Sequence, residues 1–203
     1  AGSPVALQEV RTQLGQNSSG DPRYSAIYRW PDASEPPLNQ AGTVAITFSG
    51  SVSNGIVAGV ANFAGVDQAT PLGAPVSASA TSSSAPTVTL NGLSGDELVF
   101  DNLFQGASGE TQTVTPGAGQ SALWNAFVGN TRAAASTEQA AGASVTMSWT
   151  ANSASVYAIV AVPLNPASTV GDPPVVDDIP NQTIAEGGSF TTINLDDYVE
   201  DPD

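Results

Sequence analysis

The densest group of chemically useful side chains is a cluster of five carboxylates within eight residues. Its members are Asp196, Asp197, Glu200, Asp201 and Asp203. Calcium binds six to eight oxygen ligands at about 2.3–2.6 Å, and flexible acidic segments supply them. No base stands among these acids, so a divalent cation would relieve their mutual repulsion. The spacing is not that of an EF-hand. The cluster is therefore a candidate calcium site, and the competing interpretation is a solvated acidic segment.

Residue types that are missing from the chain exclude several kinds of catalysis. The 203 residues contain no histidine and no cysteine, and the four basic residues are Arg11, Arg23, Arg29 and Arg132. The chain therefore has no Ser-His-Asp triad, no thiol nucleophile, no thiolate metal site and no lysine Schiff base. A chain with a formal charge of −15 and four arginines is not expected to bind nucleic acid or an anionic membrane.

Paired carboxylates are the remaining catalytic option, because glycoside hydrolases use two of them across a cleft. Asp96, Glu97 and Asp101 stand close together in sequence. The simpler interpretation is a turn that leads into a strand with Leu98 and Phe100 facing inward. We therefore expect no enzymatic activity.

Four aromatic side chains are candidates for stacking on a sugar: Tyr24, Tyr28, Trp30 and Trp124. Trp149 and Phe48 alternate with apolar residues and are expected to be buried. Aromatic residues make up only 6% of the chain, which is low for a sugar-binding face. An extracellular glycan therefore stands as an alternative partner.

Alternating and continuous apolar runs predict strands throughout the first 166 residues. They cover residues 24–29, 43–49, 55–66, 76–80, 86–90, 97–104, 111–115, 144–150 and 155–163. Turn signals separate them by about 8–12 residues, which is typical of a sandwich. We expect an all-β protein, namely an antiparallel, jelly-roll-like β-sandwich followed by a C-terminal extended strand segment.

Some segments carry more specific expectations. Residues 43–49 place Val44, Ile46 and Phe48 on one face, and 55–66 and 155–163 are apolar enough to be covered on both faces. Residues 151–154 predict a short, hairpin-like link. Residues 6–14 have the composition of one or two helical turns, and residues 133–141 are expected to form a loop.

The chain is expected to divide near a segment rich in proline, glycine and small polar residues. We predict a sandwich domain at 1–166, a linker at 167–173 and a strand segment at 174–203. Residues 171–203 hold nine of the nineteen acids and no base. The longest apolar run, 156–164, is too short to span a bilayer, and the chain begins at Ala1 rather than Met, without a basic region followed by an apolar one. We expect either a secreted protein whose signal peptide has been removed or an internal piece of a longer one.

Two segments resemble known extracellular families. Residues 173–203, PPVVDDIPNQTIAEGGSFTTINLDDYVEDPD, resemble the opening of a bacterial immunoglobulin-like or cadherin-like domain. Residues 5–166 resemble β-sandwich repeat modules of large secreted bacterial proteins, on the motifs YRW, ANFAGVD, AGQSALWN and SVTMSW. The second resemblance implies a non-catalytic module of adhesins, stalks or secreted enzymes, and the first implies calcium at the repeat junction. Only about the first third of an immunoglobulin-like domain is present.

A third of a domain cannot bury its own apolar face. The strand-donor candidates are Ile184, Phe190, Ile193 and Leu195. The sandwich module lacks the apolar strand expected before residues 5–14, so we expected an acceptor groove beside 156–164. A strand donated to such a groove would join copies head to tail into a homopolymer.

The sequence thus favours an extracellular or cell-surface structural subunit of a fibre, stalk or adhesin. The alternative is a carbohydrate-binding or accessory module of a secreted enzyme. Asn17 and Asn181 stand in N-glycosylation sequons and are candidate modification sites.

Overall fold

The protein is all-β and divides into two compact units, residues 1–167 and 168–203. The computed structural model describes residues 5–16, 22–30, 43–167, 175–179, 181–194 and 197–200. All strand pairing within each unit is antiparallel. No helix in these ranges is long and apolar enough to cross a membrane.

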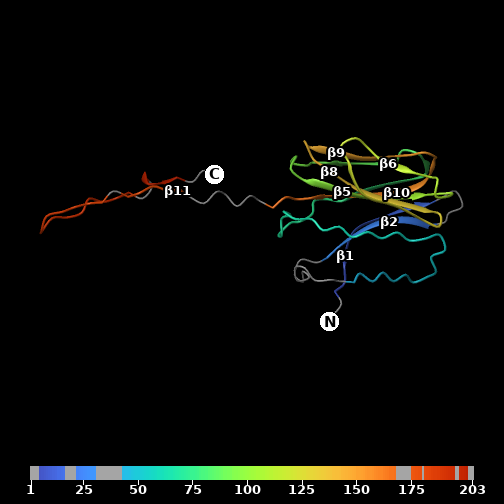
Figure 1. Ribbon diagram of the computed structural model, residues 1–203, viewed down its shortest axis with the longest axis horizontal. Coiled ribbons are helices and arrows are strands. Elements are labelled where there is room, and N and C mark those ends of the chain that lie inside the picture. Colours follow the sequence, from blue (N-terminus) through green and yellow to red (C-terminus); the bar gives the residue numbers. More distant parts are fainter. Residues whose placement is uncertain are drawn as a thin grey trace. The chain divides into compact units, whose positions relative to one another are not determined.

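The described residues of the first unit form a sandwich of ten strands in three sheets. The strands are β1 Gln8–Gln16, β2 Pro22–Arg29, β3 Val76–Ser83, β4 Thr87–Asn91, β5 Leu98–Gly106, β6 Val114–Pro116, β7 Ser121–Val128, β8 Thr131–Gln139, β9 Ser144–Ala151 and β10 Ser155–Leu164. The central sheet has the order β3-β10-β5-β8-β7. The sheet β4-β9-β6 lies on one of its faces and the hairpin β1-β2 lies on the other, as Figure 1 shows.

Both faces of the central sheet carry apolar side chains. In β10, Tyr157, Ile159 and Ala161 pack towards β4-β9-β6 in the main core. The alternate residues of β10 form smaller clusters on the opposite face, where Val160 and Val162 pack with Ile27 of the hairpin. This two-sided burial confirms that residues 155–163 form a central strand, because side chains alternate between the faces of a sheet.

The hairpin is fixed to the sheet by close backbone contact and by polar side chains. Gly15 of β1 lies so close to β10 that an added Cβ would come within 2.6 Å of the carbonyl oxygen of Tyr157. Ser25 Oγ donates a hydrogen bond to the carbonyl oxygen of Asn102 at 2.7 Å, and Asn102 Nδ2 donates to Ser25 Oγ at 2.8 Å. The hairpin therefore packs against the central sheet with one face and exposes the other.

Two expectations, helical turns within residues 6–14 and a loop over residues 133–141, were wrong. The segment expected to contain helical turns is strand β1, and the segment expected to form a loop is strand β8. In β8, Ala134 and Ala135 are fully buried. Helix propensity is a weak preference, and burial between two layers outweighs it here. The small side chain of Ala134 leaves room for Met147 and Trp149 in the same core.

Residues 43–49 and 55–66 were expected to be strands, and the structure assigns no strand to either. Val44 and Ile46 are exposed. In the second segment one side packs on the central sheet, with Gly59 against the Trp124 ring, while Val60 is 78% exposed. Apolar periodicity predicts an extended backbone, but a strand also requires a hydrogen-bonded neighbour.

Two further expectations concerned the link that precedes β10 and the edge of β10 itself. Residues 151–154 were expected to form a hairpin-like link, but β9 and β10 belong to different sheets, so this link is a corner between layers. We also expected an acceptor groove beside residues 156–164. The structure fills both sides of β10 with β3 and β5 of the same chain, so no such groove is present in this described region.

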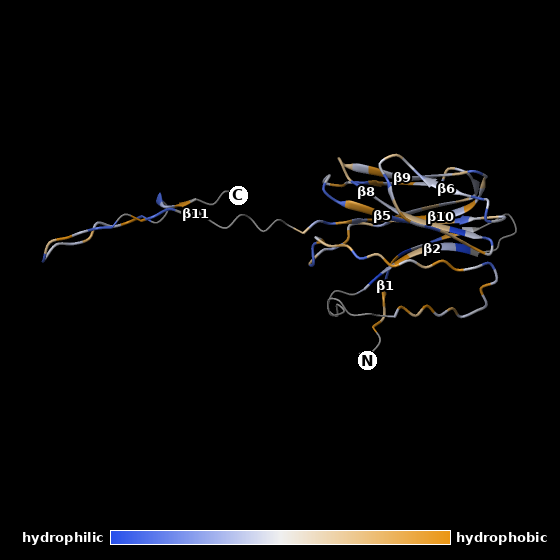
Figure 2. Ribbon diagram, viewed as in Figure 1, coloured by the Kyte–Doolittle hydropathy of each residue, from blue (hydrophilic) through white to orange (hydrophobic). Residues whose placement is uncertain are grey.

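The second unit consists of extended segments with very little strand pairing. Its strands are β11 Val175–Val176 and β12 Val199–Glu200, which pair with each other. Residues 181–185 and 188–194 run as two extended limbs joined by a turn at 186–187. Figure 2 shows apolar and polar residues mixed along these limbs.

Enlarging a buried alanine of β8 should destabilise the first unit. We expect Ala134→Leu to lower the free energy of unfolding by about 1–3 kcal/mol, because the packed core has no space for the added atoms. Ala122→Leu in β7 is the matched control, since Ala122 is exposed. Urea unfolding of the two variants measures the difference, and equal stabilities would contradict the two-sided burial of β8.

Candidate functional site

The C-terminal acidic cluster is only partly within the described residues. Asp196, Asp201 and Asp203 lie outside them, and of Glu200 only the backbone is described, in β12. Asp197 is exposed, and one of its carboxylate oxygens lies 3.5 Å from Asn194 Nδ2. Among the described residues no group of three or more acidic side chains could hold a metal ion. The calcium site therefore stays a prediction.

The strand-donor candidates of the second unit lie in the open. Ile184 and Ile193 are exposed, Phe190 is 67% exposed, and Leu195 lies outside the described residues. Ile179 and Val199 are exposed as well. Each apolar side chain of this size gains about 1.5–3 kcal/mol when it is fully buried. The described residues of this unit thus include several exposed apolar side chains and form no buried apolar core.

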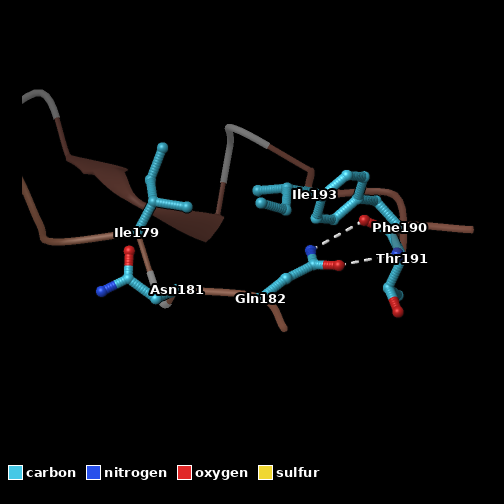
Figure 3. A pocket seen from close by; sticks show the side chains of 6 residues that line it. All are labelled: Ile179, Asn181, Gln182, Phe190, Thr191 and Ile193. Atoms are coloured by element: carbon cyan, nitrogen blue, oxygen red, sulfur yellow. Dashed lines mark hydrogen bonds between the residues drawn. The ribbon is translucent and has the colours of Figure 1, made fainter. Parts of the chain in front are cut away.

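A shallow hollow of about 360 Å³ lies between the two limbs of the second unit. Figure 3 shows the side chains of Ile179, Phe190 and Ile193 around it, together with Asn181, Gln182 and Thr191. The amide of Gln182 spans the limbs: its Nε2 donates to the carbonyl oxygen of Thr191 at 2.8 Å, and its Oε1 accepts from the Thr191 amide at 2.7 Å. The Gln182 side chain thus links the two limbs, and among the described residues no backbone ladder joins them.

The two predicted sequons have different outcomes. Asn17 lies outside the described residues. Asn181 is exposed and borders the hollow, so its side chain is accessible for modification.

The aromatic residues considered for sugar stacking do not form one platform. Tyr24 and Tyr28 point outward from β2, with 47% and 52% of their surface exposed, and Trp30 follows on the same alternation. Burial raises the pKa of the Tyr24 phenol, and the neighbouring Tyr28 phenol adds to the shift. Trp124 lies elsewhere, with its ring edge-on to Phe100 at 6.0 Å. Trp149 is buried, as expected, while Phe48 is half-buried.

The carboxylates considered for glycoside hydrolysis have structural partners. The Glu97 carboxylate accepts hydrogen bonds from the amides of Ser94 and Gly95, at 2.9 and 3.0 Å. These amides, Ser94 first, lower the pKa of Glu97 to about 2. Asp101 is fully buried and reaches no solvent. The geometry does not bring Glu97 and Asp101 together in an open cleft.

Asp101 is the centre of a buried polar network that the sequence did not indicate. Its Oδ2 accepts from Trp149 Nε1 at 2.6 Å, and its Oδ1 accepts from the amide and hydroxyl of Ser136 at 2.7 and 2.8 Å. Gln120 Nε2 donates to Ser136 Oγ at 2.7 Å, and Gln120 Oε1 accepts from the Ser148 amide at 2.8 Å. The network joins β5 and β8 of the central sheet to β9 of the covering sheet.

Burial raises the pKa of Asp101 to about 6, against an ordinary value of 3.8. The hydrogen bonds from Trp149 and Ser136 oppose this shift, and the charge of Glu138 adds to it. The sequence signal that would have revealed the buried acid is the alternation of Val99, Asp101 and Leu103, which puts Asp101 on the core face.

Comparisons with known proteins add no identification, because no family model, no curated protein and no solved structure matches this chain.

The buried Asp101 should make the stability of the first unit depend on pH. Its pKa is higher in the folded than in the unfolded state, so the folded state binds the proton more tightly. The free energy of unfolding should therefore rise by up to about 3 kcal/mol as the pH falls from about 7 to about 4. The Asp101→Asn variant should lack this pH-dependent contribution, so the parent should gain stability relative to the variant as the pH falls.

Urea unfolding at a series of pH values measures this effect. The slope of the free energy of unfolding against pH reports the titration of Asp101, whereas a loss of stability caused by the substitution itself shifts the curve equally at every pH. Asp96→Asn is the matched control, because Asp96 is exposed in the adjoining turn. The control should keep the dependence of the parent. A variant at Asp101 that kept it too would contradict the assignment.

Proposed function

We propose that this chain is a non-catalytic structural subunit or repeat of an extracellular fibre, stalk or adhesin. In this proposal the second unit joins a neighbouring copy head to tail by β-strand addition. The observation that carries the proposal is the exposure of Ile184, Phe190 and Ile193, which no buried core among the described residues of the second unit covers. Exposed apolar groups of this kind mark interaction surfaces in soluble proteins.

The backbone of the second unit supports strand addition in particular. Residues 181–185 and 188–194 are extended, and among the described residues no β-ladder joins the two limbs. An extended segment with unpaired backbone groups can add to a sheet edge of another chain, where main-chain hydrogen bonds give affinity and side chains give specificity.

The contact would join two different surfaces, one on each unit. A contact between unlike surfaces repeats from copy to copy and produces an open filament unless the rotation closes a ring. The acceptor is not beside β10, since β3 and β5 occupy both of its sides.

Composition supports an extracellular site of action. The chain has a formal charge of −15, no lysine and only 11% charged residues. Calcium at the acidic cluster and a glycan on Asn181 are part of the proposal, as modifiers of the second unit.

A carbohydrate-binding role in a secreted enzyme is the second candidate. It is favoured by Tyr24 and Tyr28, which expose their rings on one face of a rigid hairpin. Rings in that position can stack on sugars because they combine an apolar face with a polar tip.

Introducing charge into the limbs should abolish assembly. We expect the parent chain to form concentration-dependent oligomers and Phe190→Asp to weaken the association at least about tenfold, because a charge cannot be buried unpaired in an apolar contact. Thr192→Asp is the matched control, since it adds the same charge at an exposed polar position. Sedimentation velocity measures the size distribution, and electron microscopy shows whether the oligomers are filaments. A parent chain that stays monomeric at high concentration would sink the proposal.

A polysaccharide titration of the parent chain tests the second candidate, the sugar-binding role. If the chain is a sugar-binding module, titration with soluble polysaccharides should quench the fluorescence of Trp30, which adjoins the two tyrosines in sequence. Tyr28→Ala should abolish that response. A monodisperse chain with saturable quenching would favour this role over assembly.

A further inference from the structure

The buried network around Asp101 brings a carboxylate, a hydroxyl and a side-chain amide into direct contact. Asp101 of β5 and Ser136 of β8 are paired residues of adjacent strands, and Asp101 Oδ1 accepts a hydrogen bond from Ser136 Oγ at 2.8 Å. Gln120, the residue before β7, donates from its Nε2 to the same Oγ at 2.7 Å. These three groups are a general base, a nucleophile and an acyl group, which together are the components of an acyl transfer.

Ser136 Oγ is placed as the nucleophile of such a reaction. Its hydroxyl donates directly to the carboxylate of Asp101, which can therefore accept the proton as a general base. Burial raises the pKa of Asp101 to about 6, so this carboxylate is ionised at pH 7 and binds a proton more tightly than an ordinary aspartate does. Hydrogen bonds from Trp149 Nε1 and from the Ser136 amide hold the carboxylate in position.

The side-chain amide of Gln120 is held as the acyl group. Its Oε1 accepts a hydrogen bond from the Ser148 amide at 2.8 Å, and Ser148 Oγ lies 3.5 Å from the same oxygen. Donors at this oxygen stabilise the negative charge that develops when a carbonyl is attacked. The amide carbon is bonded to Nε2, so it lies at most about 4 Å from Ser136 Oγ. A movement of less than about 1 Å brings it to the distance of about 3–3.5 Å from which attack occurs.

The reacting groups lie where water does not reach. Asp101 and Ser136 have no exposed surface, and Trp149, which covers them from β9, is 1% exposed. Exclusion of water strengthens the electrostatic interactions within the site and protects a reactive acyl group from hydrolysis. An ester formed at Ser136 is therefore expected to persist in the folded chain.

We propose that Gln120 and Ser136 join in an intramolecular ester cross-link. Ser136 Oγ attacks the side-chain carbonyl carbon of Gln120, the new C–O bond forms, the bond from that carbon to Nε2 breaks, and the nitrogen leaves as ammonia. Asp101 takes the hydroxyl proton and passes it to the departing nitrogen, so the step needs no oxidant, reductant or other co-reactant. The reaction takes place once in each chain and acts on no external substrate, so it is independent of the proposed assembly between copies.

The cross-link would fasten an edge strand to the central sheet. Among the described residues β7 pairs only with β8, and Gln120 adjoins the end of β7 at which Ala122 pairs with Ser136. Local opening is easiest where few contacts hold a segment in place. A covalent link at this end keeps β7 from separating from β8, a property that suits a structural subunit under tension.

The scarcity of basic residues gives the cross-link a direct test on the unmodified full-length chain. Trypsin cleaves after arginine and lysine, so it releases residues 30–132 and 133–203 as separate peptides. Gln120 and Ser136 fall in different peptides. After unfolding and digestion we expect the two peptides to remain joined, and the intact chain should be lighter than its sequence by the mass of one ammonia. Mild neutral hydroxylamine, which cleaves esters, should separate them. Mass spectrometry measures each of these outcomes.

Three variants assign the roles within the site. Ser136→Ala should have the full mass of its sequence and release two separate peptides, because it lacks the nucleophile. Asp101→Asn should slow the loss of ammonia at least about a hundredfold, because it lacks the base. Ser148→Ala is the matched control: it removes the other hydroxyl near Gln120 but keeps the backbone amide that donates to Oε1, so it should cross-link like the parent. Circular dichroism confirms that each variant folds.

The outcome that overturns the inference needs no variant. A folded parent chain that has the full mass of its sequence and separates into the two peptides shows that the network is held by hydrogen bonds alone. Loss of the cross-link in Ser148→Ala but not in Ser136→Ala would also contradict the assignment. A parent chain that is cross-linked and stays monomeric in sedimentation would uphold this inference while removing the proposed assembly.

Discussion

The structure depends on a central sheet that is apolar on both faces and must be covered on both. Strand β10 sets this requirement, because Ile159 and Val160 are adjacent, point in opposite directions and are both fully buried. The sheet β4-β9-β6 covers one face, while the hairpin β1-β2 and residues around Gly59 cover parts of the other. The three-layer arrangement follows from this one constraint, since exposed apolar strands would be costly in water.

The same constraint explains why the polar network around Asp101 lies where it does. A carboxylate in the core needs a full set of donors, and Trp149 and Ser136 supply them from two different sheets. The network therefore fixes the relative position of the layers as well as satisfying the charge. Glu97, four residues earlier, accepts hydrogen bonds from turn amides instead. The pKa of Glu97 is therefore lowered while that of Asp101 is raised, so the two carboxylates contribute to folding stability with opposite dependence on pH.

The hairpin that covers the central sheet has an outer side on which Tyr24 and Tyr28 are exposed among the described residues. Tyr24 and Tyr28 point away from the sheet for the same reason that Ser25 and Ile27 point towards it. In the second unit Gln182 links the two limbs by hydrogen bonds, and no described residue forms a layer that covers Phe190. The exposed apolar side chains of the second unit are the observation on which the proposed assembly between copies rests.

The sequence by itself determined the all-β class, the central position of residues 155–163 and the burial of Trp149, because these follow from local periodicity and hydrophobicity. Tertiary structure decided that residues 131–139 form a strand and that 43–49 do not, since a strand exists only where a neighbour supplies its hydrogen bonds. It also decided the place of Asp101 among its donors and the separation of Trp124 from Tyr24 and Tyr28. These outcomes depend on contacts between residues far apart in the chain, which no local pattern encodes.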